Sequence, residues 1–103
     1  MSRPFIISVT DLAAAQLLSA QDWWLDNRPK APNAVREECE RACALISTQP
    51  QIGARARNVS LIGVRRLYLS RVRCFVYYRV IPESERIEVL AFWHGSRGRP
   101  PQL

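Results

Sequence analysis

Three β-type runs separated by two short turns constrain the fold of this chain more than any other feature. The connecting segments, Ser70–Arg71 and Pro82–Glu85, are short enough for hairpins, so the three strands are predicted to be consecutive and antiparallel. The runs themselves are Val64–Leu69, Val72–Val80 and Arg86–Trp93. Side chains of the middle run alternate between two faces. One face takes Val72, Cys74, Val76, Tyr78 and Val80, and the other takes Arg73, Phe75, Tyr77 and Arg79.

Two helices are predicted in the first half of the chain. The first runs from Asp11 to about Asn27, follows an N-cap signal at Thr10 and contains neither Gly nor Pro. A loop with two prolines comes next, and the second helix begins after Pro32 or Asn33. The apolar face of this second helix consists of Val35, Cys39, Ala42 and Ile46. The short loop predicts that the two helices form an antiparallel hairpin.

The order of these elements defines the predicted fold class. A short β-type run, Phe5–Val9, precedes the first helix, which gives the order β-α-α-β-β-β. This order predicts an α+β domain in which the helical hairpin packs on one face of an antiparallel sheet. The length favours a single domain, residues 1–103. Residues 94–103 contain two glycines and two prolines besides Arg97 and Arg99, and predict a flexible basic tail.

Arginine dominates the charge of the chain. The 15 Lys and Arg residues against 9 Asp and Glu residues give a formal net charge of +6, and Lys30 is the only lysine. The stretch from Arg41 to Pro82 contains eight arginines and no acidic residue. Such a field of one sign predicts a polyanionic target or an acidic protein partner, rather than a charged face that only keeps the protein in solution.

Composition and cysteine usage exclude several classes of protein. The apolar stretches are far shorter than the ~20 residues of a membrane-spanning helix and no signal-peptide pattern is visible, so a cytoplasmic protein without membrane contact is expected. Cys39 and Cys43 are one helical turn apart, and the single histidine, His94, is distant in sequence. This spacing predicts reduced core cysteines rather than a metal site. A chain of this size has little room for an enclosed cofactor pocket, so no cofactor is expected.

Four motifs in the second half of the chain occur in an order typical of a known family. They are Pro50-x-x-Gly53, Gly63-Val64-Arg65-Arg66-Leu67, Val76-Tyr77-Tyr78-Arg79-Val80 and His94-Gly95-Ser96-Arg97. Together with the element order, and over nearly the whole chain, they resemble the RelE/ParE superfamily of toxins from bacterial type II toxin–antitoxin systems. The resemblance implies a small growth-inhibiting toxin that a co-produced antitoxin neutralises.

The two branches of this superfamily differ in mechanism. RelE-like members are ribosome-dependent mRNA nucleases that work without a metal, using lysines and arginines with a tyrosine or histidine nearby. This chain has Arg66 on the first strand of the hairpins but Tyr68 two residues later, Phe75 at the middle-strand position and no tyrosine in the tail. ParE-like members share the fold without that catalytic set and poison DNA gyrase. The resemblance therefore implies a ParE-like, non-catalytic gyrase inhibitor, with a RelE-like mRNA interferase as the alternative.

Four residues are expected to contact the target. Arg66 and Tyr68 share one face of their strand and form a mixed basic and aromatic surface. Arg97 and Arg99, in the tail, are the other two candidates for the toxic contact. If the protein is a nuclease instead, then Arg66, His94 and Arg97 are the candidate catalytic residues.

The antitoxin is expected to bind at the first helix. Trp23 and Trp24 are adjacent, so their side chains point about 100° apart and only one is predicted to be core. The other, with Leu17 and Leu25, is predicted to form the exposed apolar part of an antitoxin-binding groove. The antitoxin segment is expected to be acidic as well as apolar and to form a hetero-oligomer with the toxin. A hypothesis from another class is an RNA-binding α+β module without toxicity, although the chain lacks the paired sheet-face aromatic motifs of an RRM.

Overall fold

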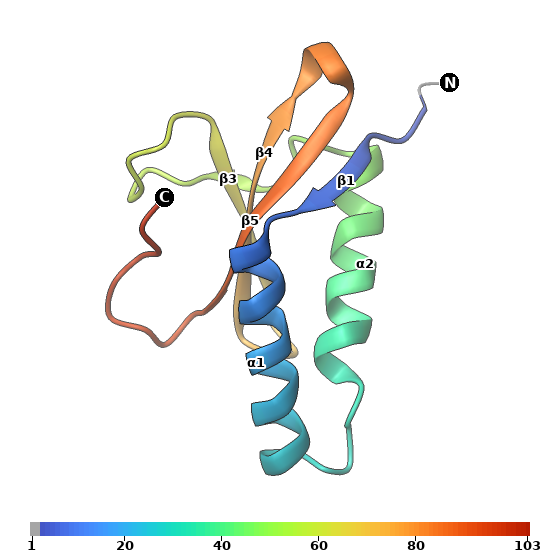
Figure 1. Ribbon diagram of the computed structural model, residues 1–103, viewed down its shortest axis with the longest axis vertical. Coiled ribbons are helices and arrows are strands. Elements are labelled where there is room, and N and C mark those ends of the chain that lie inside the picture. The colour runs from blue at the N-terminus through green and yellow to red at the C-terminus, as the bar shows by residue number, and fades with distance from the viewer. Residues whose placement is uncertain (1–2) are drawn as a thin grey trace.

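A computed structural model describes residues 3–103 and confirms the predicted α+β fold (Figure 1). Two antiparallel helices lie side by side along one face of a five-stranded sheet. The elements are β1 (Ile6–Val9), α1 (Asp11–Asn27), α2 (Ala34–Thr48), β2 (Ala54–Arg55), β3 (Val64–Leu69), β4 (Cys74–Ile81), the short 3-10 helix η1 (Pro82–Ser84) and β5 (Arg86–His94). None of the helices within the described residues is long and apolar enough to cross a bilayer.

The sheet is mixed rather than wholly antiparallel. Its strand order is β1-β5-β4-β3-β2, and β3, β4 and β5 are consecutive and antiparallel as predicted. However, β1 runs parallel to β5, with Ile7 opposite Ile87. No turn joins these two strands, so the local sequence did not determine their relative direction. Strand β2 was predicted as loop because two residues are too short to show an alternation.

The larger core, which we call the helix-side core, lies between the helices and the sheet. It buries Val35, Ala42 and Ile46 of α2 against the sheet face that carries Val76 and Tyr78, as the alternation predicted. Helix α1 contributes Ala13, and it starts where the Thr10 hydroxyl accepts the Ala13 backbone N–H at 3.1 Å, the predicted N-cap.

One acidic residue departs from the predicted pattern of α2. Glu38 is only 4% exposed, whereas the predicted core residue Cys39 is half-buried. The Glu38 carboxylate accepts a hydrogen bond from Arg41 at 2.8 Å and lies 3.7 Å from Arg71. Two cations therefore compensate the cost of burying this charge.

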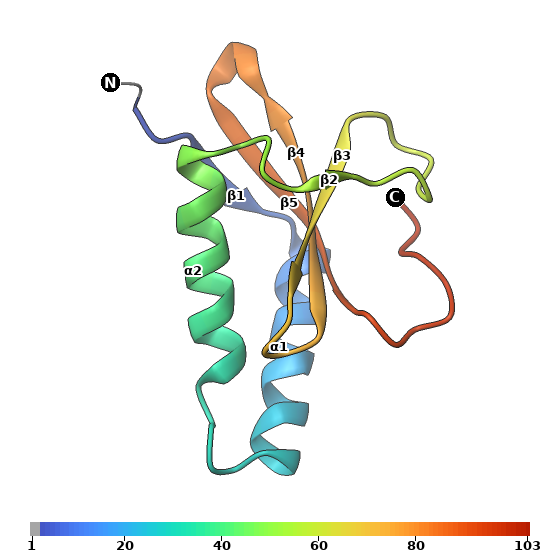
Figure 2. The ribbon, with the colours of Figure 1, turned by 180° about the vertical axis from the view of Figure 1, so that it is seen from behind.

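A second, smaller core, which we call the tail-side core, lies on the opposite face of the sheet, under the C-terminal tail. Tyr77 is 1% exposed there, beside Leu90 and Ala91, and Leu61 and Leu103 pack against the cluster. Figure 2 shows the tail on the side of the strands away from α2. The tail has no helix or strand after His94, as predicted, and the Leu103 carbonyl accepts the backbone N–H groups of Ser60 and Leu61 at 3.0 Å each. These contacts were not predicted, and the mobility of the tail stays a prediction.

A β-bulge in β5 sets which way the last residues of the strand point. Tyr77 lies opposite Ala91 and Tyr78 opposite Val89, so Leu90 is an extra residue on β5. Both Leu90 and Ala91 belong to the tail-side core, after which the alternation resumes. The bulge thereby directs Phe92 toward the helices and Trp93 toward the tail.

Candidate functional site

The C-terminal tail and the strands beneath it enclose a hollow of about 170 Å³, which we call the tail-side site. Three of the four predicted target contacts, Arg66, Arg97 and Arg99, line it. The fourth, Tyr68, lies next to it, with its ring centre 4.9 Å from that of Phe75. The other lining residues are Asn58, Phe75, Tyr77, Trp93, His94, Gly95, Gly98 and Pro100.

Two of the arginines in the tail-side site lie on aromatic rings. The Arg66 guanidinium carbon is 4.5 Å from the centre of the Phe75 ring, and that of Arg97 is 4.1 Å from the centre of the Trp93 ring. Neither arginine forms an ion pair within residues 3–103. Stacking of this kind holds a guanidinium in place while leaving its N–H donors free for a ligand.

Trp93 also attaches the tail to the sheet. Its indole N–H donates to the Arg99 carbonyl at 2.9 Å, and the Gly95 backbone N–H donates to the Arg73 carbonyl at 2.8 Å. Sequence reasoning missed Trp93 and Asn58 as site residues. The position of Trp93 depends on the bulge at Leu90, which no local pattern announces.

His94 stands at the rim of the tail-side site, exposed at the end of β5. Its Nδ1 accepts the Ser96 backbone N–H at 3.2 Å and lies 2.6 Å from the Ser96 hydroxyl. Because an accepting Nδ1 carries no proton, the neutral ring carries its proton on Nε2. Apart from His94 and the buried Tyr77, no lining residue is suited to general acid–base chemistry. Residues 3–103 contain no cluster of three His, Cys, Asp or Glu side chains able to hold a metal ion.

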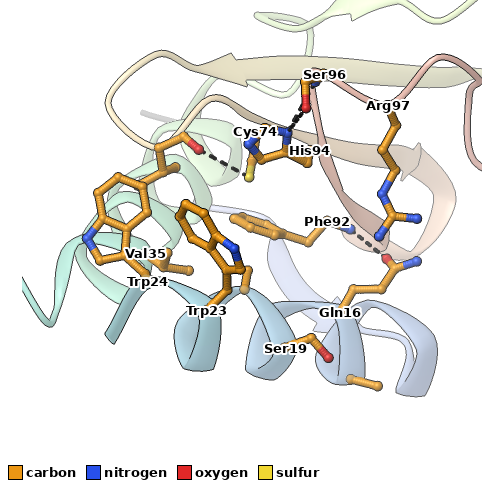
Figure 3. Close-up of a pocket in the computed structure, with 13 residues that line it drawn as sticks. Gln16, Ser19, Trp23, Trp24, Val35, Cys74, Phe92, His94, Ser96 and Arg97 are labelled. Carbon is orange, nitrogen blue, oxygen red and sulfur yellow. Dashed lines mark hydrogen bonds between the residues drawn. The ribbon is translucent and has the colours of Figure 1, made fainter. Parts of the chain in front are cut away.

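A larger hollow of about 550 Å³, which we call the α1 groove, lies between α1 and the adjoining ends of β4 and β5 (Figure 3). Trp23 and Trp24 both line it, with ring centres 6.2 Å apart. Trp24 is half-buried and packs against the helix-side core, whereas Trp23 is 52% exposed, so the two indoles differ in burial as predicted although neither is fully buried. The remaining lining residues are Ala15, Gln16, Ser19, Ala20, Val35, Val72, Cys74, Phe92, His94, Ser96 and Arg97.

The other two predicted antitoxin contacts do not line the α1 groove. Leu17 is half-buried against the helix-side core. Leu25 is exposed, but two residues of helix place it about 200° around α1 from Trp23. Gln16 lines the groove instead. Its side-chain oxygen accepts the Phe92 backbone N–H at 2.9 Å, at a point of β5 beyond its pairing with β1.

Arg97 and His94 line both hollows, so the two sites meet at the end of β5. The positive charge of Arg97 acts on the thiol of Cys74, which lines the α1 groove. Burial raises the pKa of the Cys74 thiol to about 11, and the positive charge of Arg97 opposes that rise. The rim of the α1 groove is therefore positive where its floor is apolar.

Solved structures with the same architecture place the fold in the RelE/ParE superfamily of toxins. The chromosomal ParDE system of P. aeruginosa contains a chain that is 26% identical, with a TM-score of 0.69, over 90% of this chain and 98% of that one. A chain of the RelBE2 toxin–antitoxin complex of Mycobacterium tuberculosis matches at 22% identity and a TM-score of 0.64, over 88% and 98% of the two chains. The isolated RelE toxin of E. coli matches at 17% identity and a TM-score of 0.65, over 91% and 87%.

The sequence itself defines the family more closely. Residues 7–99 match the sequence model of the ParE toxin of the type II toxin–antitoxin system parDE. The chain therefore belongs to the ParE toxin family, and the predicted resemblance is confirmed. No curated protein matches the sequence.

Proposed function

We propose that this toxin inhibits growth by binding DNA gyrase and trapping its cleaved-DNA state, without carrying out chemistry of its own. Membership of the ParE family supports the target. The observation that carries the non-catalytic role is the lining of the tail-side site, which holds the stacked guanidiniums of Arg66 and Arg97 but, besides the exposed His94 and the buried Tyr77, no side chain suited to proton transfer. A guanidinium stays protonated at physiological pH, so it binds anionic groups but does not act as a base.

A ribosome-dependent mRNA interferase is the second candidate, and His94 is the observation that favours it. This histidine is exposed at the rim of the tail-side site, which Arg66 and Arg97 also line. These three are the candidate catalytic residues if the protein is a nuclease. Attack by a 2′-hydroxyl on the neighbouring phosphate requires a base for its proton and an acid for the leaving oxygen. In the tail-side site only His94 and Tyr77 are of that type, and Tyr77 is 1% exposed. One accessible group for two proton transfers supports binding over cleavage.

Replacing His94 separates the two candidates. We expect His94→Asn to keep toxic potency within about threefold, because the amide oxygen, bonded to Cγ as Nδ1 is, can still accept the Ser96 N–H and no proton transfer is lost. General acid–base catalysis contributes about 10²- to 10⁴-fold, so a loss of that size would instead support the nuclease. The measurement is the toxin concentration that halves gyrase supercoiling, beside the rate of mRNA cleavage on translating ribosomes.

We further propose that a cognate antitoxin neutralises the toxin by placing an acidic and apolar segment in the α1 groove. Support comes from the exposed indole of Trp23, from the apolar floor that Phe92 helps to form, and from the positive charge of Arg97 at the rim. An apolar side chain on Trp23 and a carboxylate on Arg97 would satisfy both features of the groove.

Trp23→Ala is expected to weaken antitoxin binding about 30-fold, as for a central aromatic contact that contributes ~2 kcal/mol. The fold should tolerate the change, because the side chain is half exposed. Leu18→Ala is the matched control, since Leu18 is 61% exposed on the same helix and does not line the groove. Calorimetric titration with the cognate antitoxin measures both variants. Equal losses for the two would contradict the assignment of the groove.

A further inference from the structure

We infer that the tail-side site binds a single-stranded polynucleotide, with Tyr68 as a stacking surface for a base and Arg66 and Arg97 as contacts to phosphates. The inference deepens the proposed function, on which its biological role rests. In a cleaved gyrase complex the toxin would hold an exposed nucleic-acid strand directly, rather than contact the gyrase protein alone.

The charges of the site favour an external anion. Its lining contains three arginines and His94 but no carboxylate. Within residues 3–103 four arginines, Arg36, Arg41, Arg71 and Arg79, pair with carboxylates, Arg79 with Glu88 at 3.0 Å. By contrast, Arg66 and Arg97 form no ion pair within residues 3–103, and their planar groups are already held on aromatic rings. Guanidiniums pre-organised in this way match the geometry of phosphate oxygens.

The aromatic row beside these arginines favours a nucleic acid over an acidic protein segment. The rings of Tyr68, Phe75 and Tyr77 follow one another at 4.9 and 6.1 Å between centres. Tyr68, at the outer end of the row, is 48% exposed. A carboxylate needs only the arginines, whereas an unstacked base needs a flat surface, and both a tyrosine ring and the outer face of a guanidinium provide one.

The dimensions of the site favour a single strand over a duplex. A hollow of about 170 Å³ is well below the ~300–1,000 Å³ typical of small-molecule sites, so it receives one group of a ligand that continues along the surface. In a duplex the bases are stacked on each other and cannot reach Tyr68. The shared chemistry of single-stranded DNA and RNA fits the site, and the experiment distinguishes the two sources.

The test is fluorescence anisotropy of the full-length toxin with fluorescein-labelled oligothymidylate and oligouridylate of about 12 nucleotides, and with a duplex of the same length. We expect both single strands to bind more tightly than the duplex. The logarithm of the binding constant should fall with the logarithm of salt concentration with a slope of about −1.4, because Arg66 and Arg97 are the two phosphate contacts and each contributes ~0.7. The tighter of the two single strands identifies DNA or RNA as the source.

Variants separate stacking from charge. Tyr68→Ala should weaken single-strand binding about tenfold or more at an unchanged salt slope, and Tyr68→Phe should bind as the unaltered protein does. Arg66→Ala should lower the slope by ~0.7, whereas Arg66→Lys should keep the slope and lose affinity because an ammonium does not stack. Arg36→Ala is the control, since Arg36 lies on α2 beside Glu40 and away from the site. Circular dichroism confirms that each variant is folded.

Three results would overturn the inference. The first is single-strand binding that is unaffected in both Tyr68→Ala and Arg66→Ala, and the second is a duplex bound as tightly as the single strands. The third is displacement of the strand by oligoglutamate at equal or lower concentration, which would assign the site to an acidic protein. Failure of the proposed function is a separate outcome. Strand binding without gyrase–DNA complexes would refute the gyrase target alone, and gyrase–DNA complexes without strand binding would refute this inference alone.

Discussion

Gly53→Ala is expected to lower the free energy of unfolding by about 3 kcal/mol. A Cβ at this position would lie 2.7 Å from the Tyr78 hydroxyl oxygen and 2.9 Å from the backbone carbonyl oxygen of Arg66. The Gly53 N–H donates to that hydroxyl at 2.9 Å, and the hydroxyl donates to the Pro50 carbonyl at 2.8 Å. Overpacking of a core costs ~1–3 kcal/mol, and breaking a buried hydrogen bond costs a similar amount. The Gly53 carbonyl also accepts from Arg65 at 2.7 Å, so the loop is fixed to the sheet from two sides.

The measurement for Gly53→Ala is urea unfolding followed by circular dichroism. Gly98→Ala is the matched control, because nothing lies within 4 Å of a Cβ there. We expect the control to stay within about 0.5 kcal/mol of the unaltered protein, the range usual for surface changes. A Gly53→Ala variant as stable as that control would refute the tight packing between this loop and Tyr78.

Arg97→Ala is expected to weaken inhibition of the target about 30-fold or more. Arg97 is exposed, lies on Trp93 and is a lining residue of the tail-side site, which is the setting of an arginine hot spot worth ~2 kcal/mol or more. Arg97→Lys should recover only part of the loss, since a lysine keeps the charge but not the planar stack. Stability should hardly change, because the side chain is on the surface.

The assay for Arg97→Ala is the toxin concentration that halves gyrase supercoiling, compared with the unaltered protein. Arg36→Ala serves as the control. Arg36 is an exposed arginine on α2, and its only ion pair within residues 3–103 is a 3.8 Å contact with Glu40. Equal potency of Arg97→Ala and Arg36→Ala would show that net charge, and not this site, determines the effect.

Elements with a local signal were predictable from the sequence. The Thr10 cap, the two helices and the three hairpin strands lie close to where the hydrophobic spacing and turn residues placed them. The middle strand, however, begins at Cys74 rather than Val72, because Val72 and Arg73 belong to a longer turn in which Arg73 has a φ of 56°. Features that depend on distant contacts were not predictable. The parallel pairing of β1 with β5 and the bulge at Leu90 arise from packing between remote segments. Burial of Glu38 likewise requires Arg71 from another element.

The candidate site shows the same division. Arg66 and Arg97 could be selected from the charge distribution and the resemblance, and the structure brings both to one hollow. The part played by Trp93 depends on the bulge and on the tail's return to the sheet, so it was missed. Leu25 is close to Trp23 in sequence, which led to its selection, but two residues of helix place it on another side of α1.

The most direct test of the central claim is to incubate the purified toxin with gyrase, supercoiled plasmid and ATP, then add detergent and protease. We predict linear DNA released from covalent gyrase–DNA complexes, increasing with toxin concentration and strongly reduced for Arg97→Ala. A parallel incubation with translating ribosomes should leave the mRNA intact. Cleaved mRNA in that incubation, together with unaltered plasmid in the first, would contradict the account and identify the protein as a ribosome-dependent nuclease.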